Sequence, residues 1–144
     1  MTESRLRRHV VNMLRSLDAI SVENSAYPGT PDVNFVEGWI ELKKIKEWPK
    51  RRTSKLKIEH YTPQQRVWLL RRWKKGGCAL LLLQVEKEWL LFDGEVAGLK
   101  VGRLTREELY NQCLYFWETK PLTDEFLAII SLAMKRKGDS NNGN

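Results

Sequence analysis

One of the longest uninterrupted apolar runs in the chain covers residues 79–83, between Cys78 and Gln84. A run of this length is typical of a strand and is far shorter than a membrane-spanning helix, which needs roughly 20 apolar residues. Residues 78–85 are therefore predicted to form a buried strand, and no stretch of the sequence predicts a membrane span. A domain built around such a strand needs further elements to cover it.

The first half of the chain supplies such elements in alternation. Apolar residues at helical spacing predict a helix over residues 3–17. Alternating residues predict a short strand at 20–23, and strands at 33–36 and 39–45 that form a hairpin around Glu37-Gly38. Thr62 and Pro63 are typical of the N-cap and first position of a helix, which is expected to run to Lys75.

The second half predicts a strand over residues 89–92, turned back by Asp93-Gly94. Thr105 and Glu108 have the spacing of a capping box, which predicts a helix to about Trp117. Thr123 is expected to cap a last helix, to about Lys135. We thus expect a single α/β domain over residues 1–137, with a central mixed β-sheet flanked by α-helices, and a disordered polar tail at 138–144.

Charge is distributed unevenly along the chain. The formal net charge is +7, and residues 44–75 hold twelve lysines and arginines against two acids, Glu47 and Glu59. A basic block of this kind favours contact with phosphates. The two cysteines, Cys78 and Cys113, lack metal-ligand spacing and are interpreted as reduced thiols in a cytoplasmic protein, which also argues against zinc.

The predicted hairpin brings two carboxylates together. Glu41 and Lys43 lie two residues apart on one strand and so share a face, with Leu42 pointing into the core. Asp32 begins the neighbouring strand, after a rigid turn. Carboxylates meeting at a strand end can hold Mg²⁺ or Mn²⁺, with the backbone carbonyl of Leu42 as a further oxygen ligand. The alternative is that Glu41 and Lys43 are ordinary solvent-facing strand residues.

Four segments together resemble a known family. They are residues 24–32 (NSAYPGTPD), 39–43 (WIELK), 61–66 (YTPQQR) and 76–77 (GG). This order is similar to that of the VRR-NUC branch of the PD-(D/E)XK nucleases, and the likeness covers about residues 3–92. It implies a restriction-endonuclease-like core and a metal-dependent nuclease that acts on DNA. The long basic insertion between Lys43 and Thr62 departs from the family pattern.

The resemblance also implies a role for individual residues. Asp32 and Glu41 would be metal ligands, Lys43 the catalytic lysine, and Gln65 the glutamine near the metal. Glu3 would complete the metal site from the first helix. Two alternatives stay open, since Glu3 also suits the dipole of a helix N-terminus, and Gln65 could be an exposed helix residue with Gln64 as its competitor.

The basic segment supplies the expected DNA contacts, which are Lys44, Lys46, Lys50, Arg51, Arg52, Lys55, Lys57 and Arg66. Trp48 lies among them, and packing on the domain is preferred over stacking on a base.

The expected function is a Mg²⁺- or Mn²⁺-dependent endonuclease that cuts Holliday junctions or other branched DNA as a homodimer. The small size fits a phage or mobile-element enzyme. The alternatives are a flap nuclease, exonuclease or restriction-like nuclease, and a non-catalytic DNA-binding module.

Overall fold

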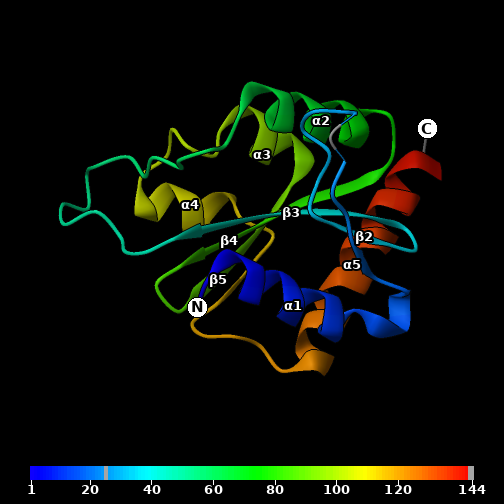
Figure 1. Cartoon of the computed structure of the whole chain (residues 1–144). Helices are drawn as coiled ribbons and strands as arrows, with labels where there is room; N and C mark the ends of the chain where they lie inside the picture. The colour runs from blue at the N-terminus through cyan, green and yellow to red at the C-terminus, as the bar shows by residue number, and fades with distance from the viewer. Residues whose placement is uncertain (25, 143–144) are drawn as a thin grey trace.

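The computed structural model describes residues 1–24 and 26–142, with side chains described as far as Lys135. Its centre is a six-stranded sheet in the order β1-β2-β3-β4-β5-β6 (Figure 1). The strands are β1 Ile20–Ser21, β2 Val33–Phe35, β3 Gly38–Ile45, β4 Cys78–Val85, β5 Glu88–Asp93 and β6 Tyr115–Trp117. Neighbours pair antiparallel except β3 and β4, which are parallel, so the sheet is mixed.

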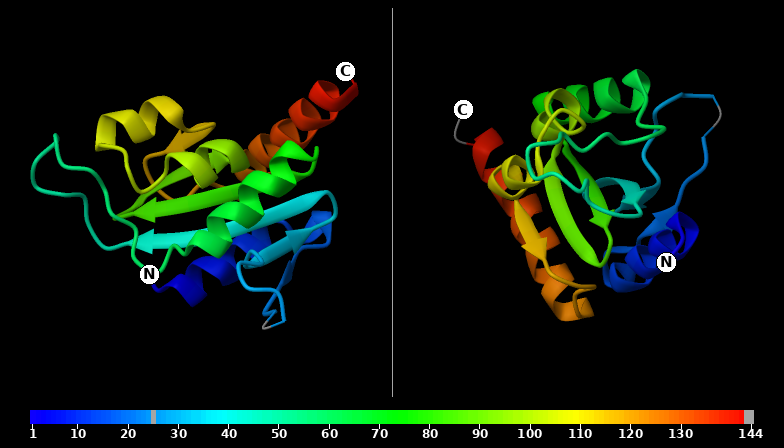
Figure 2. Two further views of the ribbon diagram at one scale, coloured as in Figure 1. Left: turned by 90° about the horizontal axis from the view of Figure 1, so that it is seen from above. Right: turned by 90° about the vertical axis from the view of Figure 1, so that its left-hand side faces the viewer.

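Helices cover both faces of this sheet. One face carries α1 Glu3–Met13 and α5 Thr123–Asn142, and the other carries α2 Pro63–Lys74, α3 Gly94–Leu99 and α4 Arg106–Gln112 (Figures 1 and 2). A short 3-10 turn, Arg15–Leu17, follows α1. The parallel pair needs a crossover, and α2 supplies it between β3 and β4. The predicted class, an α/β domain with a central mixed sheet flanked by helices, is confirmed.

Strand β4 lies at the centre of the core. All its residues are buried, and alternate side chains enter two apolar clusters on opposite faces. Leu80 and Leu82 pack in the cluster with α1 and α5, whereas Leu81 and Leu83 pack in the cluster with α2 and α3. A fully buried leucine contributes roughly 2 kcal/mol. The apolar run in the sequence therefore reflects burial on both faces of the strand.

The hairpin of β2 and β3 has the predicted position. Val33 pairs with Ile40, and Phe35 pairs with Gly38 at the turn. Gly38 also lies against β4, where an added Cβ would come within 2.4 Å of the Cys78 carbonyl oxygen. Only glycine allows this close approach, so the hairpin turn and the start of the parallel pair depend on the same residue.

Two predictions for the second half of the chain assigned the wrong kind of secondary structure. Asp93-Gly94 does not turn the chain back, because the Asp93 side chain accepts a hydrogen bond from the Val96 N–H and caps α3. The capping box of Thr105 and Glu108 is present, but its helix ends at Gln112 and residues 115–117 form β6. Pairing of β6 with β5 and burial of Trp117 override the helical pattern there.

The last helix also differs from its prediction. It begins at Thr123 itself, and the Leu122 N–H donates to the Glu125 side chain just before it. The helix continues to Asn142, so residues 138–142, which were predicted to be disordered, are helical; residues 143–144 lie outside the described part. Among the described residues, no helix is both long and apolar enough to cross a membrane.

Candidate active site

The hairpin places Asp32 opposite Glu41. The register pairs Val33 with Ile40, and continuing it by one residue sets Asp32 opposite Glu41, in agreement with a hydrogen bond between their side chains. The Asp32 carbonyl oxygen accepts a hydrogen bond of 2.8 Å from the Val22 N–H, so the backbone here still follows the sheet. Directly opposed residues of an antiparallel pair project to the same face. The two carboxylates therefore converge, as the sequence predicted.

Asp32 is held on both of its oxygens. The Leu42 N–H donates to Oδ2 at 2.9 Å, and the Arg7 Nη2 donates to Oδ1 at 2.8 Å. The N–H and C=O of one strand residue point to the same side of the strand. The Leu42 carbonyl therefore also points toward the Asp32 side, where a metal ligand is expected.

Glu41 is the most unusual group of the site. Its side chain is 1% exposed, and its Oε2 is buried with no hydrogen-bond partner in the described part of the chain. Burial raises the pKa of Glu41 to about 10, with further upward contributions from a hydrogen bond to Asp32 and from the Asp32 charge. Desolvation and a like charge both disfavour the ionised form. The Glu41 Oε2 atom is thus a buried oxygen that could accept a cation.

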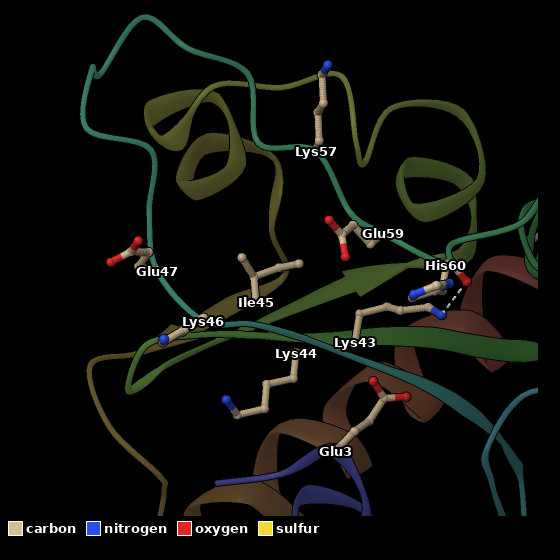
Figure 3. A pocket seen from close by; sticks show the side chains of 9 residues that line it. All are labelled: Glu3, Lys43, Lys44, Ile45, Lys46, Glu47, Lys57, Glu59 and His60. Carbon is tan, nitrogen blue, oxygen red and sulfur yellow. Dashed lines mark hydrogen bonds between the residues drawn. The ribbon is translucent and has the colours of Figure 1, made fainter.

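Lys43 lies on the same face and is also buried, at 5% exposed. Its Nζ donates to the His60 carbonyl oxygen at 2.8 Å (Figure 3). His60 has a φ of 61°, a left-handed conformation that histidine adopts more readily than most residues. The Lys43 charge opposes the rise in the pKa of Glu41. The ammonium is thus fixed beside the carboxylate pair.

Glu3 approaches this site without joining it. Its carboxylate points toward Lys43 in Figure 3, and its charge contributes to raising the pKa of Glu41. Within the described residues, however, no three His, Cys, Asp or Glu side chains are grouped to hold a metal ion. A role for Glu3 as a third ligand stays a prediction.

Gln65 has a structural role in this conformation. Its Oε1 accepts from the Thr62 N–H at 3.0 Å, while the Thr62 hydroxyl accepts from the Gln65 N–H at 3.2 Å. This is a complete capping box at the start of α2. The spacing Thr62-x-x-Gln65 is the sequence signal of such a box. A place for Gln65 near a metal stays a prediction.

A cavity of about 650 Å³ opens beside Lys43. It lies between the start of α1, the end of β3 and the returning part of the loop over residues 46–61 (Figure 3). Its lining residues are Glu3, Lys43, Lys44, Ile45, Lys46, Glu47, Lys57, Glu59 and His60. Four of these residues are lysines and three are glutamates, so the charge of the cavity wall is mixed. Three predicted DNA contacts, Lys44, Lys46 and Lys57, are among these residues.

The other predicted DNA contacts have different surroundings. Arg52 pairs with Glu107, and Lys55 forms a backbone bridge to Thr105. Arg66 donates to the Val101 carbonyl at 2.5 Å and lies 4.1 Å from the centre of the Tyr61 ring, and burial lowers its pKa. Lys50 and Arg51 are exposed. The Arg66 side chain is thus occupied by contacts within the domain, whereas the Lys50 and Arg51 side chains are exposed to solvent and accessible to a ligand.

The loop over residues 46–61 is fastened to the domain by a group that we call the Trp48 clamp: Trp48, Glu88, Arg106 and Tyr110. Trp48 is 6% exposed, and its Nε1 donates to Glu88 Oε2. The Arg106 guanidinium lies 4.7 Å from the Trp48 ring centre, and the Tyr110 hydroxyl donates to Glu88 Oε1 at 2.7 Å. The prediction that Trp48 packs on the domain is confirmed.

Sequence reasoning missed two residues of the site, Arg7 and the His60 carbonyl. Arg7 is four residues from Glu3 on the same helix, which is the only sequence signal for its position. The backbone conformation of His60 has no such signal. Comparisons with protein-family models, with curated proteins and with solved structures found no match to this chain.

Proposed function

We propose that this protein is a metal-dependent nuclease that hydrolyses DNA phosphodiester bonds. The observation that carries the proposal is the pair Asp32 and Glu41, opposed across the hairpin with one buried Glu41 oxygen lacking a partner. Buried polar oxygens of this kind are normally hydrogen-bonded or bind a metal. Oxygen ligands at such a site favour Mg²⁺ or Mn²⁺.

Each residue has a separate task in this proposal. Asp32, Glu41 and the Leu42 carbonyl would hold the ion, because the Asp32 side chain contacts both the Glu41 side chain and the Leu42 backbone. A bound Mg²⁺ or Mn²⁺ would acidify a water and neutralise charge on the scissile phosphate. Lys43 would stabilise the negative charge that develops on the phosphate, since its buried ammonium is already oriented by the His60 carbonyl.

The proposed substrate is DNA, and the cavity beside Lys43 gives the phosphate backbone a path to the site. Lys44, Lys46 and Lys57 line this path. Lysine contacts to phosphate carry no sequence information, which suits an enzyme that recognises DNA shape. We extend the proposal to branched DNA cut by a homodimer, because paired cuts at a four-way junction require two active sites.

A cleavage assay tests the proposal directly. Purified protein would be incubated with a four-way junction, a flap, linear duplex and single strand, in Mg²⁺, Mn²⁺ or EDTA. We expect metal-dependent products, lost in Glu41→Gln and retained in Glu118→Gln, an exposed glutamate after β6. Symmetric cuts at the junction would support the dimeric resolvase.

A second candidate is a DNA-binding module without catalysis. Its supporting observation is that Asp32 and Lys43 already have protein partners, Arg7 and the His60 carbonyl. DNA binding with no product in either metal would favour it over the nuclease.

A further inference from the structure

Arg7 contacts the proposed metal site from outside the sheet. It lies on α1, where Leu6 and Val10 are buried beneath the helix. Its Nη2 is 2.8 Å from Asp32 Oδ1, and the two side chains are only 25% and 16% exposed. The other acid near it, Glu23, is 3.7 Å away and 90% exposed, so that contact is weak. The guanidinium is therefore directed at Asp32.

Two further observations set this pair apart from an ordinary surface ion pair. Arg7 Nε is buried and has no hydrogen-bond partner among the described residues. The carboxylate that Arg7 contacts is also the one opposite Glu41. A guanidinium stays charged at every relevant pH. The metal-free site thus contains, in addition to the Lys43 ammonium, a permanent positive charge that the helix holds in place.

A divalent ion bound to Asp32 would come close to this charge. Like charges repel strongly where the surroundings are partly buried, because water screens them poorly. The same guanidinium also withdraws electron density from a carboxylate that would ligate the ion. Arg7 therefore stabilises Asp32 without metal and opposes metal binding.

We propose that Arg7 is a built-in cation of this site. Its guanidinium holds Asp32 in place in the metal-free protein, and its positive charge lowers the affinity of the site for a divalent ion. Arg7 is thus a positioning residue that sets the affinity for metal. The inference rests on the proposed function, since it takes Asp32 as a metal ligand. A purely structural ion pair would behave differently, because its loss would lower stability and leave metal affinity unchanged or weaker.

Metal binding to the full chain tests this inference without any need for activity. Mn²⁺ would be titrated by calorimetry into the native protein, Arg7→Gln, Arg7→Lys and Arg8→Gln, and thermal unfolding would be recorded with and without Mn²⁺. Arg8 is the exposed neighbour on the same helix and serves as the matched control. Asp32→Asn would be measured in parallel to locate the binding.

We expect Arg7→Gln to melt at a lower temperature without metal and to bind Mn²⁺ about tenfold more tightly. Its melting temperature should therefore rise more on addition of Mn²⁺ than that of the native protein. Arg7→Lys keeps the charge and should bind Mn²⁺ nearly as the native protein does. Should Arg7→Gln be unfolded without metal, Mn²⁺ is expected to restore its fold.

Several results would overturn the inference. Unchanged or weaker Mn²⁺ binding in Arg7→Gln, with binding still abolished by Asp32→Asn, would refute the role of Arg7 and leave the metal site standing. An Arg7→Gln protein that Mn²⁺ fails to refold, beside a folded Arg7→Lys, would also refute it. If the native protein does not bind Mn²⁺, or if Asp32→Asn leaves Mn²⁺ binding unchanged, the proposed function is refuted instead.

Discussion

Two clusters of buried and partly buried ionisable residues lie on this fold, and they differ in whether their carboxyl oxygens have hydrogen-bond partners. In the Trp48 clamp, Glu88 Oε1 accepts from the Tyr110 hydroxyl, and Oε2 accepts from Trp48 Nε1 and lies 3.5 Å from Arg106 Nη2. In the candidate active site, Glu41 Oε2 has no partner within the described chain, although it is more deeply buried.

This contrast is the one expected between a structural cluster and the proposed active site. An unsatisfied buried polar group costs about 1–3 kcal/mol, so a fold keeps one only where something offsets the loss. The clamp satisfies its charges internally and fastens a long loop to α4. The hairpin holds two carboxyl groups together and leaves one buried Glu41 oxygen without a partner, an arrangement suited to a cation from solution.

The largest effect is expected when a proposed metal ligand is changed. Glu41→Gln should lower cleavage by roughly a thousandfold, because the amide is neutral and binds a divalent ion poorly. Single-turnover cleavage of the preferred substrate in Mg²⁺ measures this. Glu88→Gln, the matched change in the clamp, should retain most activity; equal losses in both would abolish the distinction.

Removing the centre of the clamp should cost the most stability. Trp48→Ala is expected to lower the free energy of unfolding by about 3–4 kcal/mol, because a large buried ring leaves a cavity and Glu88 loses a donor. Trp48→Phe keeps an aromatic ring and should lose less. Urea unfolding measures both, and a Trp48→Ala protein as stable as the native one would show that the loop is not held by this group.

The stability of the metal-free protein should depend on pH through Glu41. Its pKa in the folded state, about 10, lies above the ordinary value of 4.5, so the folded protein binds an extra proton between these values. The stability from this proton is complete below pH 4.5 and is lost as pH rises toward 10.

Glu41→Gln should remove this dependence and raise stability at pH 8 by on the order of 2 kcal/mol. Urea unfolding at several pH values in EDTA would show it. An unchanged pH slope in Glu41→Gln would mean that another group causes the dependence.

The smallest effects are expected for single basic residues. Lys57→Ala should weaken DNA binding a few-fold and lower the slope of log affinity against log salt by about one, if this lysine contacts a phosphate. Arg52→Ala should change less, because Arg52 already pairs with Glu107. Fluorescence anisotropy over a salt series measures both. A larger loss for Arg52 would place the DNA over the loop tip instead of the cavity.

Most of the central sheet was predictable because its signals are local. The limits of β4 follow from an apolar run, and the β2–β3 hairpin follows from alternation around a tight turn. The helix predicted at residues 113–117 was wrong because strand pairing with β5 decided that segment. Propensity is a weak guide where a neighbouring strand offers a better partner.

The sequence by itself determined that Glu41 and Lys43 share a face and that Asp32 lies opposite them, because strand alternation and hairpin register depend only on nearby residues. The tertiary structure alone decided that Arg7 reaches Asp32, that the His60 carbonyl holds Lys43, and that Trp48 fastens the basic loop to Glu88. These contacts join segments far apart in the chain. Their geometry depends on how whole elements pack, and no local pattern records that.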